Sequence, residues 1–224
     1  MANPPLESAP VDIETFVDLL QRRNLERSSH APFRFLADGE SEEINLTYAE
    51  LDRQARAIAA WLQRSQNAGD RAILIYPPGL EYITAFFGCL YAGVIAVPAY
   101  LPRMNRLTSR LLSIVADAKP SLVLTTRRIL SDVTKRLAGV PELLSLQWMA
   151  TDNIEPGIEN AWVKPELTGD SLSFLQYTSG STQAPKGVMV THRNLLHNSE
   201  AIKQFFGNGP HSSGVIWLPP YHDM

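Results

Sequence analysis

A run of 21 residues without a charged side chain, YITAFFGCLYAGVIAVPAYLP, separates Glu81 from Arg103. This run restricts the fold more than any other feature, because it is long enough to cross a bilayer. Its internal residues instead favour burial in a globular protein. Gly93 suits the C-terminal cap of a helix, and the largely β-branched segment after it ends at Pro98. The sequence therefore predicts a buried helix to about Ala92, then a buried strand from Val94, and no membrane span.

Strand-like and helix-like segments alternate on either side of this run. The strand-like segments are AILIY, SLVLTT, LSLQWMA and SLSFLQY, and apolar residues at helical spacing lie between them. Alternation of this kind predicts an α/β fold with a largely parallel sheet covered by helices on both faces. Upstream, Thr47-Tyr48-Ala49-Glu50 matches a capping box and predicts the start of a helix. Residues 151–170 are rich in acidic residues, proline and glycine, so we expect a surface loop there.

The charge balance excludes some classes of partner. The 224 residues include 20 Lys and Arg against 23 Asp and Glu, a net charge of −3. The chain therefore lacks the excess of basic residues that would indicate binding to nucleic acid or to an anionic membrane. Cys89 is the only cysteine and cannot form an internal disulfide, which fits a reducing, cytoplasmic location. Since no histidine or other base lies near it in the sequence, we expect Cys89 to be a core residue.

The segment YTSGSTQAPKGVMVTH, residues 177–192, carries the clearest chemical signal. A run of small and hydroxyl-bearing residues, Thr178 to Thr182, lets backbone N–H groups converge on an anion. Lys186 adds a cation that can neutralise phosphate charge, and Gly187 permits a turn into the next strand. An ordinary Ser/Gly turn is the competing interpretation. The order of residues fits neither a Walker A loop nor a hydrolase nucleophile elbow, and no metal-ligand spacing of Cys and His occurs.

Four motifs in register resemble those of the adenylate-forming enzymes. They are LTYAELD, YPPGLEYITAFFGCLYAGVIAVPAY, LQYTSGSTQAPKGVMVTHRNLLHN and WLPPYHDM, and they are most similar to fatty acyl-AMP ligases. The resemblance implies a flavodoxin-like α/β subdomain together with an incomplete part of a second α/β lobe. It also implies that a fatty acid reacts with ATP to give acyl-adenylate and pyrophosphate, before the acyl group passes to an acyl carrier protein or polyketide synthase module. One departure is Gln183, which occupies a position that is glycine in the common signature.

The resemblance also assigns roles to residues. Lys186 and His222 are the expected catalytic residues, with His222 orienting the carboxylate or shaping the pocket. The phosphates of ATP are expected to contact Thr178, Ser179, Gly180, Ser181, Thr182 and Gly187. Mg²⁺ is expected to share the phosphate charge, with Thr182 as a residue near the ion. Of the other histidines, His192 is expected to have only a structural role.

The same resemblance suggests how the chain is divided. Residues 1–10 form a flexible tail, 11–69 an incomplete part of a neighbouring lobe, 70–207 the α/β subdomain, and 208–224 the truncated start of the neighbouring lobe. We expect this chain alone not to form acyl-adenylate, and its unpartnered apolar faces make self-association plausible. An apolar face of the helix from Arg193 to Phe206 is expected to pack inward. The alternatives are part of an acyl-CoA synthetase or peptide-synthetase adenylation domain, or a non-catalytic nucleotide-binding or scaffold fragment.

Overall fold

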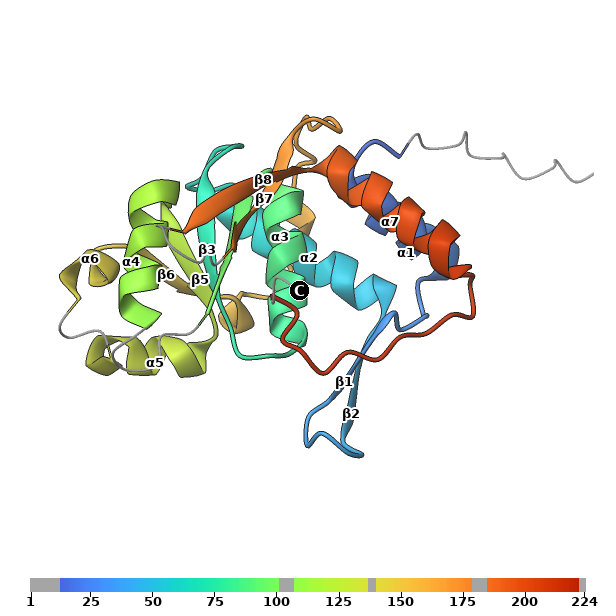
Figure 1. Ribbon diagram of the computed structural model, residues 1–224, viewed down its shortest axis with the longest axis horizontal. Coiled ribbons are helices and arrows are strands. Elements are labelled where there is room, and N and C mark those ends of the chain that lie inside the picture. Colours follow the sequence, from blue (N-terminus) through green and yellow to red (C-terminus); the bar gives the residue numbers. More distant parts are fainter. Residues whose placement is uncertain (1–12, 101–106, 137–139, 179–184, 222–224) are drawn as a thin grey trace, which may run out of the picture.

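A mixed six-stranded sheet forms the centre of the computed structural model, which describes residues 13–100, 107–136, 140–178 and 185–221 (Figure 1). In spatial order its strands are β6 (Gln147–Ala150), β5 (Leu122–Thr125), β3 (Arg71–Ile75), β4 (Ile95–Ala99), β7 (Leu172–Thr178) and β8 (Lys186–Thr191). Each neighbouring pair from β6 to β7 is parallel, and only β8 runs antiparallel to its neighbour. The predicted α/β class is confirmed.

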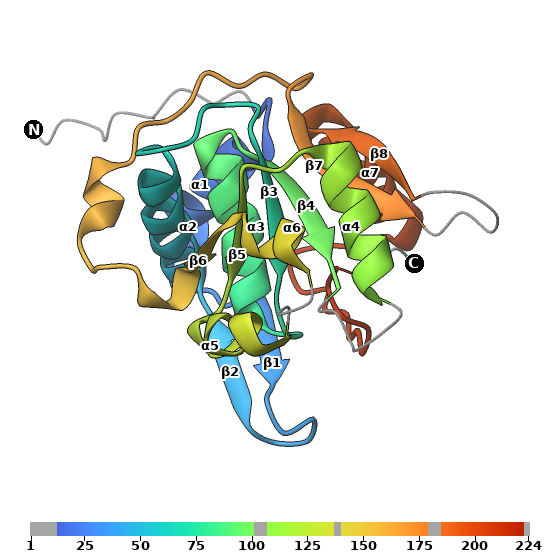
Figure 2. The same ribbon diagram turned by 90° about the vertical axis from the view of Figure 1, so that its left-hand side faces the viewer.

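The central strands are buried on both faces because their side chains alternate between two apolar clusters. On β3, Ala72 and Leu74 face one cluster while Ile73 and Ile75 face the other. Helices cover both faces, as parallel sheets require (Figure 2). This arrangement explains why AILIY reads as a continuous apolar run rather than an alternating one.

One face of the sheet is covered by α1 (Phe16–Arg27), α2 (Tyr48–Leu62) and α3 (Leu80–Ala92). Thr47 and Glu50 form the predicted capping box at the start of α2. Gly93 ends α3 with φ 73°, a left-handed conformation that glycine adopts at little cost, so this predicted cap is also confirmed. Cys89 lies in α3, fully buried and unpaired.

The opposite face is covered by α4 (Leu107–Ala118), α5 (Arg127–Arg136) and the short α6 (Pro141–Leu144). The chain passes from β3 through α3 to β4, and then from β4 through α4 back to β5 on the far side of β3. The change of direction accounts for α3 and α4 lying on opposite faces, since crossovers between parallel strands keep one hand. Among the described residues, no helix is both long and apolar enough to span a bilayer.

The helix α7 (His192–Phe206) differs from the expectation. Thr191 is its N-cap, but its apolar residues do not all pack inward. Ile202 is 43% exposed and Phe206 70% exposed, so the predicted packing face is wrong over the second half of α7. The stretch 151–170 is the expected surface loop, and it holds the short 3-10 turns Thr151–Asn153 and Ile158–Ala161.

Residues 13–69 share their core with the sheet. Val17 and Leu20 from α1 and Leu51 and Ile58 from α2 belong to the same apolar cluster as Leu74 of β3. The antiparallel pair β1 (Phe33–Leu36) and β2 (Glu43–Leu46) projects away from this body (Figures 1 and 2). The division of the protein into lobes at residues 70 and 207 stays a prediction.

Candidate functional site

Thr178 and Lys186 face each other at the end of the β7–β8 hairpin where the connecting loop begins and ends. Thr178 is the last residue of β7, Lys186 is the first of β8, and the two are directly paired in the antiparallel register. Both are exposed. Since β7 is parallel to β4, this end of the hairpin lies at the carboxyl edge of the parallel strands, where open α/β sheets bind ligands. A hydroxyl-bearing residue and a lysine are therefore paired at the edge that suits anion binding.

Six of the residues singled out in the sequence fall outside the described part of the chain. Ser179, Gly180, Ser181, Thr182 and Gln183 lie between β7 and β8, and His222 follows the last described residue, Tyr221. Their expected roles in phosphate binding and carboxylate orientation stay predictions.

Gly187 lies inside β8 rather than at a turn before it, which corrects the sequence expectation. It pairs directly with Tyr177 of β7, and the aromatic ring lies over it. A Cβ atom at Gly187 would lie 2.9 Å from Cζ of Tyr177, closer than real side chains approach. The structure therefore gives this glycine a packing reason: only a residue without a side chain leaves room for the ring.

Tyr177 is buried and receives two contacts from α4. Its hydroxyl donates to Oδ2 of Asp117 at 2.6 Å, and Nη2 of Arg110 donates to its carbonyl oxygen at 3.0 Å. Burial, together with the hydrogen bond to Asp117, raises the pKa of the Tyr177 phenol above its ordinary value. Sequence reasoning missed this group. Its signal was the spacing of Arg110, Ile114 and Asp117, which places all three on one face of a helix.

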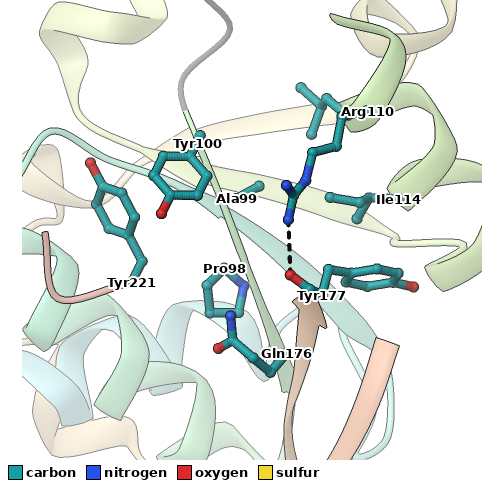
Figure 3. Close-up of a pocket in the computed structure, with 9 residues that line it drawn as sticks. Pro98, Ala99, Tyr100, Arg110, Ile114, Gln176, Tyr177 and Tyr221 are labelled. Carbon is teal, nitrogen blue, oxygen red and sulfur yellow. Dashed lines mark hydrogen bonds between the residues drawn. The ribbon is translucent and has the colours of Figure 1, made fainter. Parts of the chain in front are cut away.

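A pocket opens between the carboxyl ends of β4 and β7 (Figure 3). β4 and β7 are neighbours in the sheet. After β4 the chain continues to β5 on one side of this pair, and after β7 it continues to β8 on the other side. Such a switch point is the usual ligand crevice of an open α/β sheet. The pocket is lined by Pro98, Ala99, Tyr100, Arg110, Leu111, Ile114, Gln176, Tyr177 and Tyr221.

Tyr221 brings the end of the described chain to this pocket. Its ring packs edge-on against Tyr82 and Tyr100, with centroid separations of 5.3 and 5.2 Å. Tyr221 is buried by these contacts. The residue that precedes His222 is thus anchored beside the candidate site.

His192 has the structural role that the sequence suggested. It is buried at the start of α7, and its Nδ1 accepts a hydrogen bond from the backbone N–H of Phe16 at 3.2 Å. Burial lowers the pKa of this imidazole below its ordinary value, although nearby Asp18 opposes the shift. A neutral ring is the form that can accept this bond.

Described residues supply no obvious metal site. Within that part of the chain, no group of three or more His, Cys, Asp or Glu side chains is arranged to hold a metal ion. Thr182, which was expected near Mg²⁺, lies in the undescribed segment.

Comparison with known proteins shows what the chain is similar to. The sequence profile of the family described as AMP-binding enzyme matches residues 22–224. The chain is 43% identical over 216 residues to the medium-chain-fatty-acid–[acyl-carrier-protein] ligase JamA of Moorena producens, covering 95% of this chain and 36% of JamA. It is 39% identical to the long-chain-fatty-acid–AMP ligase FadD23 of Mycobacterium tuberculosis, covering 84% of this chain and 33% of that protein. The chain thus spans about a third of the length of these relatives.

A solved structure shares the fold. The fatty acyl-adenylate ligase from L. pneumophila, crystallised in complex with acyl adenylate and pyrophosphate, superposes with a TM-score of 0.85 and 39% sequence identity. The superposition covers 94% of this chain and 36% of that one.

Proposed function

The chain belongs to the family of AMP-binding enzymes, and from this premise we propose that the whole protein is a fatty acyl-AMP ligase. The observation that carries the proposal is the pairing of Thr178 with Lys186 at the carboxyl edge of the sheet. The names of JamA and FadD23 support a fatty acid as the substrate. The acyl adenylate and pyrophosphate bound to the L. pneumophila enzyme support ATP as the second substrate.

In the first half of the proposed reaction, a carboxylate oxygen of the fatty acid attacks the α-phosphorus of ATP. A new P–O bond forms, the bond to the β-phosphate oxygen breaks, and pyrophosphate leaves with the electron pair. Negative charge grows on that leaving group, so a fixed cation and aligned hydrogen-bond donors lower the barrier. In this proposal Lys186 supplies the cation and Thr178 a hydroxyl donor, and Ser179 to Thr182 add further donors.

In the second half, a thiolate attacks the acyl carbon of the adenylate. A C–S bond forms and AMP leaves as the C–O bond to its phosphate breaks. We propose the phosphopantetheine thiol of an acyl carrier protein, alone or in a polyketide synthase module, as the acceptor. The name of JamA supports this choice over coenzyme A. His222, next to the anchored Tyr221, would orient the carboxylate in the first half of the reaction.

Two further parts of the proposal concern the surroundings of the reaction. Mg²⁺ is proposed as a cofactor that would arrive with the phosphates of ATP, since the described residues offer no ligand cluster for it. A cytoplasmic location is supported by the single, buried and unpaired Cys89.

Self-association of this 224-residue chain is also proposed. Phe205, Phe206, Ile216 and Trp217 are all more than two-thirds exposed, and exposed apolar side chains favour association. Sedimentation velocity at increasing concentration tests this, with Phe206→Ser expected to shift the chain towards the monomer. A monomer at all concentrations would contradict it.

The activity is tested by ATP–pyrophosphate exchange in the whole protein with a series of fatty acids. We expect exchange that depends on the fatty acid and falls by about 100-fold or more in Lys186→Ala, because one fixed charge at a leaving group contributes roughly that much. Thr182→Ala should also lower the rate.

Lys203→Ala is the matched control, since Lys203 is another exposed lysine that pairs with Glu200 on α7. It should exchange at the wild-type rate. Wild-type rates in Lys186→Ala and Thr182→Ala would contradict the proposed phosphate site. Transfer to coenzyme A but not to a carrier protein would contradict the proposed acceptor.

A further inference from the structure

One face of α4 contacts both the backbone and the side chain of Tyr177. Arg110 donates to the Tyr177 carbonyl oxygen (Figure 3), and Asp117 accepts from its hydroxyl seven residues further along the helix. Seven residues make about two helical turns, so both groups point to the same side. Between them Ile114 packs in the apolar cluster that includes Tyr177. The tyrosine is therefore fixed at its carbonyl and at the tip of its ring.

Tyr177 in turn adjoins both residues of the candidate site. It directly precedes Thr178 in β7, and its ring covers Gly187, which directly follows Lys186 in β8. The two site residues are themselves paired across the hairpin. A displacement of the Tyr177 ring would therefore act on β7 through the chain and on β8 through the contact at Gly187.

Apolar burial holds this end of the hairpin through Tyr177 of β7 but does little to hold β8. β8 stands at the edge of the described sheet, and Val188 and Met189 next to the site are at least half exposed. Besides the apolar packing of Tyr177, two hydrogen bonds with α4 tie the end of the hairpin to the scaffold. They link it to the helix that follows β4, the other strand of the pocket.

We propose that Tyr177 is a positioning residue, held by Asp117 and Arg110, that sets where Thr178 and Lys186 stand relative to the phosphates of ATP. The inference rests on the proposed function. It concerns residues outside the reacting groups, so Tyr177 acts through its neighbours and not on the substrate.

The first test is Tyr177→Phe in the whole protein. This change removes the hydrogen bond to Asp117 but keeps the ring over Gly187. We expect kcat/KM for ATP to fall several-fold, on the order of tenfold at most, as loss of one hydrogen bond allows. The KM for the fatty acid should stay unchanged, since the displaced groups face phosphate. If Tyr177 had a purely structural role, its loss would change the kinetic constants for both substrates together or for neither.

Tyr91→Phe is the matched control. The Tyr91 hydroxyl donates to Oδ1 of Asp52 at 2.7 Å, the same kind of bond, but it lies in the cluster on the opposite face of the sheet. This variant should lose stability while keeping the wild-type kcat/KM for ATP, when both are assayed below their melting temperatures.

Changes at Asp117 separate the hydrogen bond from other effects. Asp117→Asn keeps an acceptor for the phenol and should stay near the wild-type kcat/KM for ATP, whereas Asp117→Ala should resemble Tyr177→Phe. The double variant Tyr177→Phe/Asp117→Ala should lose no more kcat/KM for ATP than either single variant, because both changes remove the same hydrogen bond.

The outcomes distinguish this inference from the function beneath it. If the wild-type protein shows no exchange with any fatty acid, the proposed function fails. If the wild-type protein is active and Tyr177→Phe matches Tyr91→Phe in kcat/KM for ATP, the positioning role fails and the function stands. Additive losses in the double variant would also overturn the role.

Discussion

The central strands and the β7–β8 hairpin are held by different kinds of interaction. Leu74 in β3 is 0% exposed and lies between two helical layers, whereas Met189 in β8 is 67% exposed at the edge of the described sheet. Apolar burial therefore stabilises the central strands, while the hairpin end that bears Thr178 and Lys186 is held mainly through Tyr177 and its hydrogen bonds with α4. Stability and site geometry can accordingly be changed separately in this molecule.

The largest contrast is expected from truncating one apolar side chain in each region. Leu74→Ala should lower the free energy of unfolding by about 2–5 kcal/mol, because it removes buried methyl groups and leaves a cavity. Met189→Ala should change it by no more than about 0.5 kcal/mol, as at most exposed positions. Urea unfolding of the 224-residue chain measures both, and equal midpoints would show that the two regions do not differ as described.

Replacing a glycine by alanine should also affect the stability of the two regions differently, but the difference in free energy of unfolding should be smaller. A Cβ at Gly88 of α3 would lie 2.5 Å from Cγ2 and 2.6 Å from Cβ of Ile58, so α2 and α3 would have to move apart. Gly88→Ala should cost about 1–3 kcal/mol through overpacking. At Gly187 the nearest atoms belong to the Tyr177 ring, at 2.9 and 3.1 Å, so the overlap to be relieved is smaller than at Gly88.

Gly187→Ala should therefore cost less stability than Gly88→Ala and yet disturb Tyr177. The same urea measurement compares the two glycines. A loss at Gly187 as large as that at Gly88 would mean that the hairpin end is packed as rigidly as the core.

The two capping boxes should respond in different ways. Thr47 and Glu50 cap α2 in the core, and Thr191 and Asn194 cap the largely exposed α7. Thr47→Ala should lower global stability by about 1 kcal/mol. Thr191→Ala should mainly speed amide exchange in α7, with a smaller global effect, because poorly packed elements open locally. Hydrogen-exchange mass spectrometry follows both, and unchanged exchange in α7 would contradict this difference.

The smallest effect at neutral pH is expected from His192, which joins the end of the hairpin region to α1. Its pKa is lowered by burial, so below its ordinary value of 6.5 the unfolded chain binds the proton more readily than the folded one. Stability from this group is therefore complete above pH 6.5 and declines as the pH falls through the folded pKa. Asp18 packs nearby, and hydrogen bonds from Lys164 and Thr15 outweigh burial to lower its pKa, so it adds acid sensitivity only below about 3.8.

His192→Asn keeps a side-chain acceptor without a titrating ring. Thermal unfolding between pH 7 and pH 5 should show a shallower decline in this variant than in the wild-type chain. Equal slopes would mean that His192 does not carry the acid sensitivity in that range.

Much of the scaffold was predictable because its signals are local. The capping box at Thr47 and the helix end at Gly93 each depend on residues within one turn of each other. The alternation of strands and helices likewise follows from hydrophobic patterns a few residues long. Lys186 and Thr178 could be singled out for the same reason, since the small, hydroxyl-bearing and basic residues that indicate anion binding follow one another directly in the sequence.

The parts that escaped prediction depend on contacts between distant residues. The face of α7 that was expected to pack inward leaves Ile202 and Phe206 exposed. The pattern of residues within a helix does not show which other element packs against its apolar face. Gly187 suggested a turn until its pairing with Tyr177 placed it inside a strand.

The sequence by itself determined the α/β class, the start of α2 and the end of α3, and it singled out Thr178 and Lys186 as candidates for a phosphate site. Short-range sterics and hydrogen bonding decide these helix ends. Only the tertiary structure decided that β7 pairs with β8 in this register, and that Arg110 and Asp117 meet Tyr177 from more than 50 residues away in the chain. Those contacts follow from how helices and strands pack in three dimensions. No local pattern encodes which side chains that packing brings together.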